Sequence, residues 1–234
     1  MRRHFLSSAA HRMAGISALV VMGLAVGLPG DADAQYHRYA AGFTAGGSLI
    51  TDLNPGAPGD ALSLTPDAGF VLGLHGDRWY GPEGRFGIRY QGAYQRPTFD
   101  WAQGERRIGA LSADVGALIR LTPPGNDATA LPFITGGFGG LWYDLGTGDP
   151  TTFEDADAFH DGGSRVLPLL MVGAGVDVDV PWDWQGAPVR LRVEVSDHMT
   201  FGSPIRQASD GTRYGQVHHF RLSLGLHSIF DLRR

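Results

Sequence analysis

The chain has 234 residues, enough for one substantial domain, and contains 35 Gly, 10% aromatic residues and a net charge of −5. The sequence has no Lys, so arginine supplies all its Lys/Arg cations, and the arginines form no long basic run. The composition therefore does not indicate a nucleic-acid partner. The sequence has no Cys, which excludes both a disulfide framework and a lipoprotein anchor.

Residues 1–34 have the three parts of a secretory signal peptide. A basic segment without acids (MRRHFLSSAAHR) precedes an apolar one (MAGISALVVMGLAVGL), and Ala32 and Ala34 form the A-x-A arrangement that a signal peptidase accepts. We therefore predict cleavage between Ala34 and Gln35 and a mature domain at 35–234. An N-terminal membrane anchor is the alternative interpretation.

Eight segments of the mature chain alternate apolar and polar residues with a period of two, which is typical of strands with one apolar face. Much Gly and many aromatic residues likewise favour an all-β protein. In chain order, the predicted strands are 37–50, 68–80, 85–95, 107–121, 131–145, 165–180, 188–201 and 217–230. Each has about ten or more residues, the length that a tilted strand needs to cross a bilayer, whereas strands of soluble sheets commonly have about 5–6.

The same alternation predicts which side chains face the interior of a barrel. The predicted interior set is His75, Asp77, Arg85, Arg89, Asp114, Arg120, Asp177, Asp179, Arg190, Arg192, Glu194, His198, His219, Arg221 and His227. An unpaired buried charge is costly, and the planar fork of arginine binds a carboxylate through two hydrogen bonds. We therefore expect these groups to pair and to plug the barrel, because eight strands enclose just enough space for side chains. A narrow ion path is the alternative.

Long connections alternate with shorter ones along the chain. The long ones are 51–67, 96–106, 146–164 and 202–216, and the shorter ones are 81–84, 122–130 and 181–187. An up-and-down barrel with both termini in the periplasm and its long loops outside the cell has this layout.

The five tryptophans lie near predicted strand ends or in the connections beside them. The membrane–water interface accommodates both the apolar ring and the N–H of this residue. We therefore predict an aromatic girdle of Trp79, Trp101, Trp142, Trp182 and Trp184. The alternative is that Trp182 and Trp184 are simple turn residues.

This pattern, over nearly all of 35–230, resembles the small eight-stranded outer-membrane β-barrel proteins, the group that includes the OmpA-like transmembrane domain. In the last strand, Ser223, Gly225 and Phe230 are similar to the signal read by the barrel assembly machinery, whereas Ser228 stands where a hydrophobic residue is usual. The resemblance implies an all-β, eight-stranded antiparallel up-and-down transmembrane β-barrel in the cell outer membrane. It also implies contact with outer-membrane lipid and lipopolysaccharide, and with the assembly machinery through 217–230. We expect a monomer.

The sequence contains no pattern that identifies a metal or cofactor site. His218 and His219 are adjacent, so on a strand they face opposite sides and cannot bind one ion together. There is no HExxH motif and no tight His/Asp cluster. The acidic loop 146–164 lacks the EF-hand spacing, although weak bridging of Ca²⁺ or Mg²⁺ to lipopolysaccharide is an alternative.

The stretch 194–200 (EVSDHMT) is the one most similar to a catalytic site. Glu194, Ser196 and His198 are alternate residues on one strand face, and some eight-stranded lipid A deacylases carry a Ser/His/acid site that faces lipid. Here Ser196 and His198 share the face of Arg192, which predicts an interior position. We therefore expect a structural or surface-interaction protein that is not an enzyme and has no cofactor. The alternatives are a secreted lipocalin-like barrel binding a small apolar ligand and a lipid A-modifying enzyme centred on Ser196 and His198.

Overall fold

The computed structural model describes residues 38–51, 65–66, 68–81, 84–96, 98–101, 104–107, 109–122, 129–144, 164–202 and 216–231. The predicted signal peptide at 1–34 and the acidic loop at 146–164 therefore fall outside the described residues, apart from Ser164. In the described part of the chain, no helix has the length and apolar character that crossing a membrane requires.

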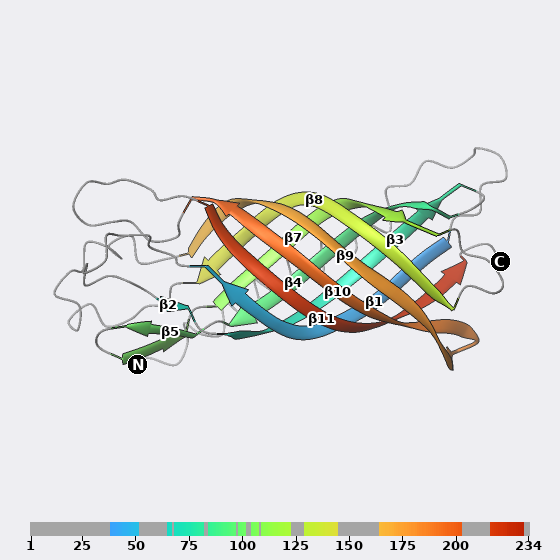
Figure 1. Ribbon diagram of the computed structural model, residues 1–234, viewed down its shortest axis with the longest axis horizontal. Coiled ribbons are helices and arrows are strands. Elements are labelled where there is room, and N and C mark those ends of the chain that lie inside the picture. Colours follow the sequence, from blue (N-terminus) through green and yellow to red (C-terminus); the bar gives the residue numbers. More distant parts are fainter. Residues whose placement is uncertain are drawn as a thin grey trace, which may run out of the picture. The chain divides into compact units, whose positions relative to one another are not determined.

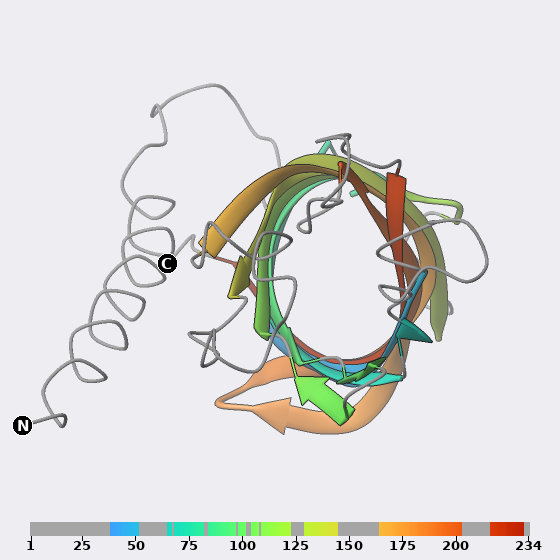
Figure 2. The same cartoon turned by 90° about the vertical axis from the view of Figure 1, so that its left-hand side faces the viewer.

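Eight long strands form a closed antiparallel barrel (Figures 1 and 2). They are β1 (Arg38–Ile50), β3 (Gly69–Tyr80), β4 (Phe86–Arg96), β7 (Gly109–Arg120), β8 (Ala130–Asp144), β9 (Ser164–Trp184), β10 (Ala187–Phe201) and β11 (Gln216–Asp231). Each of these strands pairs with the one that follows it in the sequence. The first and last strands, β1 and β11, close the ring by pairing from Arg38↔Asp231 to Ile50↔His219. The predicted all-β, eight-stranded, antiparallel up-and-down barrel is confirmed.

The long connections leave the barrel at one end, which we call the loop end. Two of them contain short strands: β2 (Thr65–Pro66) pairs with β5 (Thr98–Trp101), which pairs with β6 (Gly104–Arg107). Apart from Arg107, which begins the predicted strand 107–121, these residues lie in segments predicted to be loops. The opposite end, where Arg38 pairs with Asp231, is called the turn end.

The hairpin of β9 and β10 differs from the prediction at the turn end. The connection predicted at 181–187 is only a two-residue turn, in which Gln185 and Gly186 have φ angles of 53° and 78°. Two successive positive φ angles are typical of a type I′ hairpin turn. Pairing of β8 with β9 ends at Val178, so β9 continues beyond β8, and in Figure 2 the hairpin (orange) bends away from the ring.

Inward-facing glycines line two seams on opposite sides of the ring, between β1 and β11 and between β7 and β8. An added Cβ would lie 1.9 Å from the Leu222 carbonyl oxygen at Gly46 and 2.1 Å from the Ala113 carbonyl oxygen at Gly139. At these glycine positions the paired strands approach too closely for an inward Cβ, and glycine permits the approach.

Candidate functional site

The two faces of the barrel wall have opposite polarity. Phe138, Leu74 and Leu222 on the outer face are 70%, 64% and 57% exposed, whereas Arg89 and Arg192 on the inner face are each 1% exposed. A soluble protein has the reverse arrangement, and a lipocalin-like barrel would need an apolar interior for its ligand. An apolar outer wall around a polar interior is the arrangement of a barrel that spans a bilayer. The chain is therefore a transmembrane barrel.

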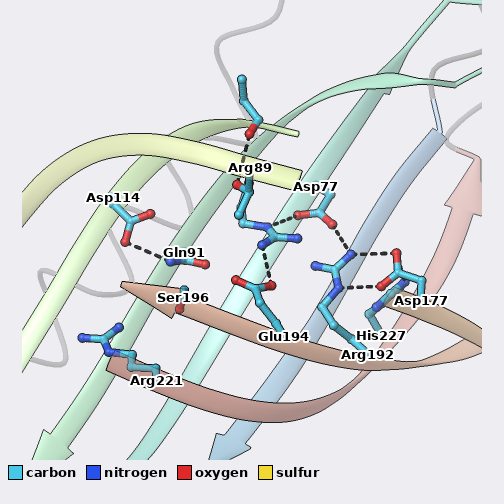
Figure 3. Close-up of polar contacts among 12 residues, drawn as sticks. Asp77, Arg89, Gln91, Asp114, Asp177, Arg192, Glu194, Ser196, Arg221 and His227 are labelled. Atoms are coloured by element: carbon cyan, nitrogen blue, oxygen red, sulfur yellow. Dashed lines mark hydrogen bonds and ion pairs between the residues drawn. The ribbon is translucent and has the colours of Figure 1, made fainter. Parts of the chain in front are cut away.

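A chain of five charged side chains, which we call the charged ladder, crosses the interior (Figure 3). Arg89 Nη1 lies 2.7 Å from Glu194 Oε2, and Arg89 Nε lies 3.0 Å from Asp77 Oδ1. Arg192 Nη2 lies 2.8 Å from Asp77 Oδ2, and Arg192 Nε lies 2.6 Å from Asp177 Oδ1. Because β4 and β10 stand four places apart in the ring of eight strands, the contact between Arg89 and Glu194 joins opposite walls.

The aromatic ring of Phe133, on β8, packs against both arginines of the charged ladder. The Arg89 and Arg192 guanidinium carbons lie 5.1 Å and 4.8 Å from its centroid. This geometry is favourable for both cations, because the π face of the ring is negative. The two arginines are thus held by carboxylates and by one shared aromatic ring.

Nearer the turn end, the Arg120 guanidinium lies over the indole of Trp79, with its central carbon 3.6 Å from the ring centroid. Arg120 also donates to the carbonyl of Gly84 at 3.1 Å, and Trp79 is 1% exposed. The prediction that Trp79 belongs to an outer girdle is wrong. Trp79 shares the parity of His75 and Asp77, so its side chain points into the barrel.

Nearer the loop end, polar contacts of Arg221 and His219 connect different sides of the barrel wall. Arg221 Nη2 donates to Ser112 Oγ at 3.1 Å, across the ring from β11 to β7. His219 lies between two partners, with Nδ1 2.8 Å from Gln95 Nε2 and Nε2 2.6 Å from Tyr143 Oη. These contacts form a second polar layer, between the charged ladder and the loop end.

Ser196, His198 and Asp114 form the arrangement most similar to a hydrolytic site. Ser196 Oγ lies 3.2 Å from His198 Nε2, and His198 Nδ1 lies 4.0 Å from Asp114 Oδ2. The second distance is too long for a hydrogen bond. The acid suggested by the sequence, Glu194, binds Arg89 instead. Asp114 comes from β7, and no local spacing in the sequence links it to His198.

The space beside this cluster is small. A cavity of about 30 Å³ is lined by residues that include His75, Gln91, Ser196, His198 and Arg221. A water needs roughly 10–15 Å³ by a comparable measure, whereas pockets for drug-sized ligands have about 300–1,000 Å³. The cavity therefore has room for water but not for a lipid chain.

Most of the predicted interior set lies where the alternation places it. Twelve of the fifteen side chains are buried: His75, Asp77, Arg89, Asp114, Arg120, Asp177, Arg192, Glu194, His198, His219, Arg221 and His227. Arg85 is half-buried. Arg190 pairs with Asp179 near the turn end, where the Asp179 side chain is 46% exposed.

The described part of the outer wall carries a contact between Asp197 and His218 that the sequence pattern does not indicate. Asp197 Oδ2 lies 2.7 Å from His218 Nδ1, and both side chains have outward parity near the loop end. His218 also stacks on Phe220, with ring centroids 5.8 Å apart. Within the described ranges, no three His, Asp or Glu side chains form a group that could hold a metal ion.

Three of the predicted girdle tryptophans lie on the outer face. Trp182 and Trp184 are 60% and 68% exposed on the β9–β10 hairpin, and Trp142 is half-buried near the loop end of β8. The side chain of Trp101 lies outside the described residues. Their positions relative to the membrane interface stay a prediction.

No family model matches the chain, and no curated protein is similar to it in sequence. Solved structures that are similar in fold include Neisserial surface protein A (16% identity, TM-score 0.48, 82% of this chain and 97% of that one). The outer membrane protein OprG from Pseudomonas aeruginosa is another (15%, 0.46, 83% and 95%), as is the outer membrane enzyme PagL (14%, 0.40, 80% and 97%). The fold assignment therefore rests on the strands of this chain, and these likenesses carry no conclusion about activity.

The architecture is that of the small eight-stranded outer-membrane barrels, and the protein is located in the outer membrane. Its closed eight-stranded ring, apolar outer wall and polar interior are all properties of its own strands. Helical segments and closed barrels alone can satisfy every backbone hydrogen bond within lipid, and this chain uses the second solution.

Proposed function

We propose that the protein is a structural or surface-interaction barrel whose polar interior is closed to solutes. The observation that carries the proposal is the charged ladder, in which Arg89 and Arg192 connect carboxylates from three strands. The buried charges of the described residues comprise four arginines and four carboxylates, so they balance formally. Opening a path would separate ion pairs that have little access to water, which is costly.

The layout of the barrel supports a proposal about its partners. We propose that the loop end lies outside the cell and contacts lipopolysaccharide, and that the protein is a monomer. The assembly machinery would recognise residues 217–230, because β11 pairs with β1 to close the ring and carries Phe230 at the turn end. The ring of Phe230 stacks on that of Tyr39, with centroids 6.2 Å apart.

Enzymatic activity is not part of this proposal. Ser196 and His198 are 5% and 1% exposed inside the barrel, beside a cavity of water size, and so have no access to a lipid substrate. Cells that carry Ser196→Ala or His198→Ala should have the same lipid A profile as cells with the wild-type protein. An altered profile with normal levels of folded barrel would favour the lipid A-modifying alternative.

Solute entry into vesicles tests the closed interior. Liposomes that contain the purified barrel should swell in arabinose no faster than empty liposomes, whereas liposomes with a general porin should swell rapidly. Swelling that increases with the amount of folded barrel would contradict the proposal.

A further inference from the structure

Arg78 is a cation on the outer wall of the barrel near the turn end. In β3 it lies between the inward-facing Asp77 and Trp79, so its side chain has outward parity. Its paired neighbours are Tyr39 of β1 and Ile88 of β4, which are both uncharged. An arginine on the lipid side is costly at the bilayer midplane but costs little at the interface, so this position needs a polar environment.

Two tyrosine rings hold this guanidinium. Its central carbon lies 5.7 Å from the Tyr39 ring centroid and 5.0 Å from the Tyr80 ring centroid. Tyr39 is itself fixed by stacking on Phe230. We call Tyr39, Arg78 and Tyr80 the tyrosine–arginine cradle.

The charge of Arg78 has no acidic partner within the described part of the chain. The arginine–carboxylate pairs there join inward-facing arginines to inward-facing carboxylates, as Arg89 joins Asp77. A cation that faces the membrane interface without a carboxylate is complementary to an anionic lipid headgroup. The phosphate of a phospholipid matches the planar fork of arginine, which binds it through two parallel hydrogen bonds.

We propose that the tyrosine–arginine cradle is a binding site for the phosphate of a phospholipid in the leaflet that surrounds the turn end. The long side chain of Arg78 carries its charge toward the headgroups while its stem covers apolar wall. The two rings restrict the guanidinium before the lipid arrives, which lowers the conformational entropy lost on binding. The site lies outside the barrel and is independent of whether the interior is closed.

Native mass spectrometry of the detergent-solubilised barrel tests this site, with phosphatidylglycerol as the probe. The wild-type barrel should retain one phosphatidylglycerol, and Arg78→Gln should weaken retention by about tenfold or more, because a charge-assisted pair is lost. Arg78→Lys should lie between them, because an ammonium keeps the charge but lacks the fork. Arg96→Gln is the matched control, since Arg96 is an exposed, outward-facing arginine at the loop end of β4.

Three further measurements test whether the effect depends on a lipid phosphate and whether each variant is folded. Monogalactosyldiacylglycerol, which lacks phosphate, should be retained equally by the wild type and Arg78→Gln, and millimolar inorganic phosphate should not displace phosphatidylglycerol. Heat-dependent gel mobility establishes that each variant is folded. Equal retention of phosphatidylglycerol by folded Arg78→Gln and the wild type, or its displacement by inorganic phosphate, would overturn the proposal.

Discussion

Arg192 connects carboxylates from two strands, Asp77 of β3 and Asp177 of β9, with a side chain that is 1% exposed. Buried ion pairs seldom stabilise a fold more than apolar side chains of the same volume would. Removal of a single partner is different, because the remaining charge is left in a medium that solvates it poorly. Each ladder residue is therefore needed once the others are present.

Replacement of Arg192 by Ala should lower the free energy of unfolding by about 3–5 kcal/mol, because Asp77 and Asp177 lose a shared cation. The matched control is Arg190→Ala, two residues away on the same strand and face. Its partner Asp179 is nearly half exposed, so this change should cost at most about 1 kcal/mol. Urea titrations of both variants in phospholipid vesicles measure the difference, and equal losses would argue against a buried ladder.

The facing of individual side chains could be predicted from the sequence, but their partners could not. The alternation along β10 predicts correctly that Arg192, Glu194 and Ser196 face inward. The contact between Arg89 and Glu194, 105 residues apart, depends on how the ring closes and on the register of every strand between them. The prediction fails for Trp79 because its parity in β3 turns the side chain inward, where Arg120 lies over the indole, and this outweighs the general preference of Trp for interfaces.

At the scale of elements, the seam between β1 and β11 depends on adjacent glycines with different surroundings. Gly46 faces inward, where an added Cβ would lie 1.9 Å from the Leu222 carbonyl oxygen. Gly47 faces outward, where the nearest atom to an added Cβ, the Gly69 carbonyl oxygen, is 3.9 Å away. At these two positions, the closing pair of the barrel therefore tolerates a methyl group on the outward face and not on the inward face.

Gly46→Ala should destabilise the barrel by about 1–3 kcal/mol, because β1 and β11 must separate to admit the methyl group. Gly47→Ala should change the stability by no more than about 0.5 kcal/mol. The folded fraction as a function of urea, read from gel mobility, compares the two variants. A loss at Gly47 as large as that at Gly46 would show that the seam is not limited by close approach.

Strand ends were harder to predict than the strands themselves. Pro181 marked the end of the sixth predicted strand, but β9 continues through it to Trp184. Pairing with β8 stops at Val178, and a proline is tolerated where a strand edge does not donate to a neighbour. A local sequence pattern does not show that one strand extends beyond the end of its neighbour.

At the scale of the whole molecule, closure of the ring leaves no free strand edge along the barrel, since β1 pairs with both β3 and β11. Unfolding must therefore break the backbone ladders of at least two strand pairs together. The folded protein should resist sodium dodecyl sulfate at room temperature and migrate differently after boiling. Identical mobility before and after boiling, together with recovery as a soluble periplasmic monomer, would contradict a transmembrane barrel.

The interior decides what kind of barrel this is. The charged ladder, the stack of Arg120 on Trp79 and the layer around His219 lie at different levels, so each of them would have to open for a continuous path. The proposed closure would therefore be a property of the whole interior and not of one pair.

Single-channel recording in planar bilayers tests this claim most directly. The folded wild-type barrel should give no large conductance steps at potentials where a general porin in the same bilayer opens readily. Frequent large steps that require the folded barrel would show that the polar interior is open, and would contradict the proposed closed barrel.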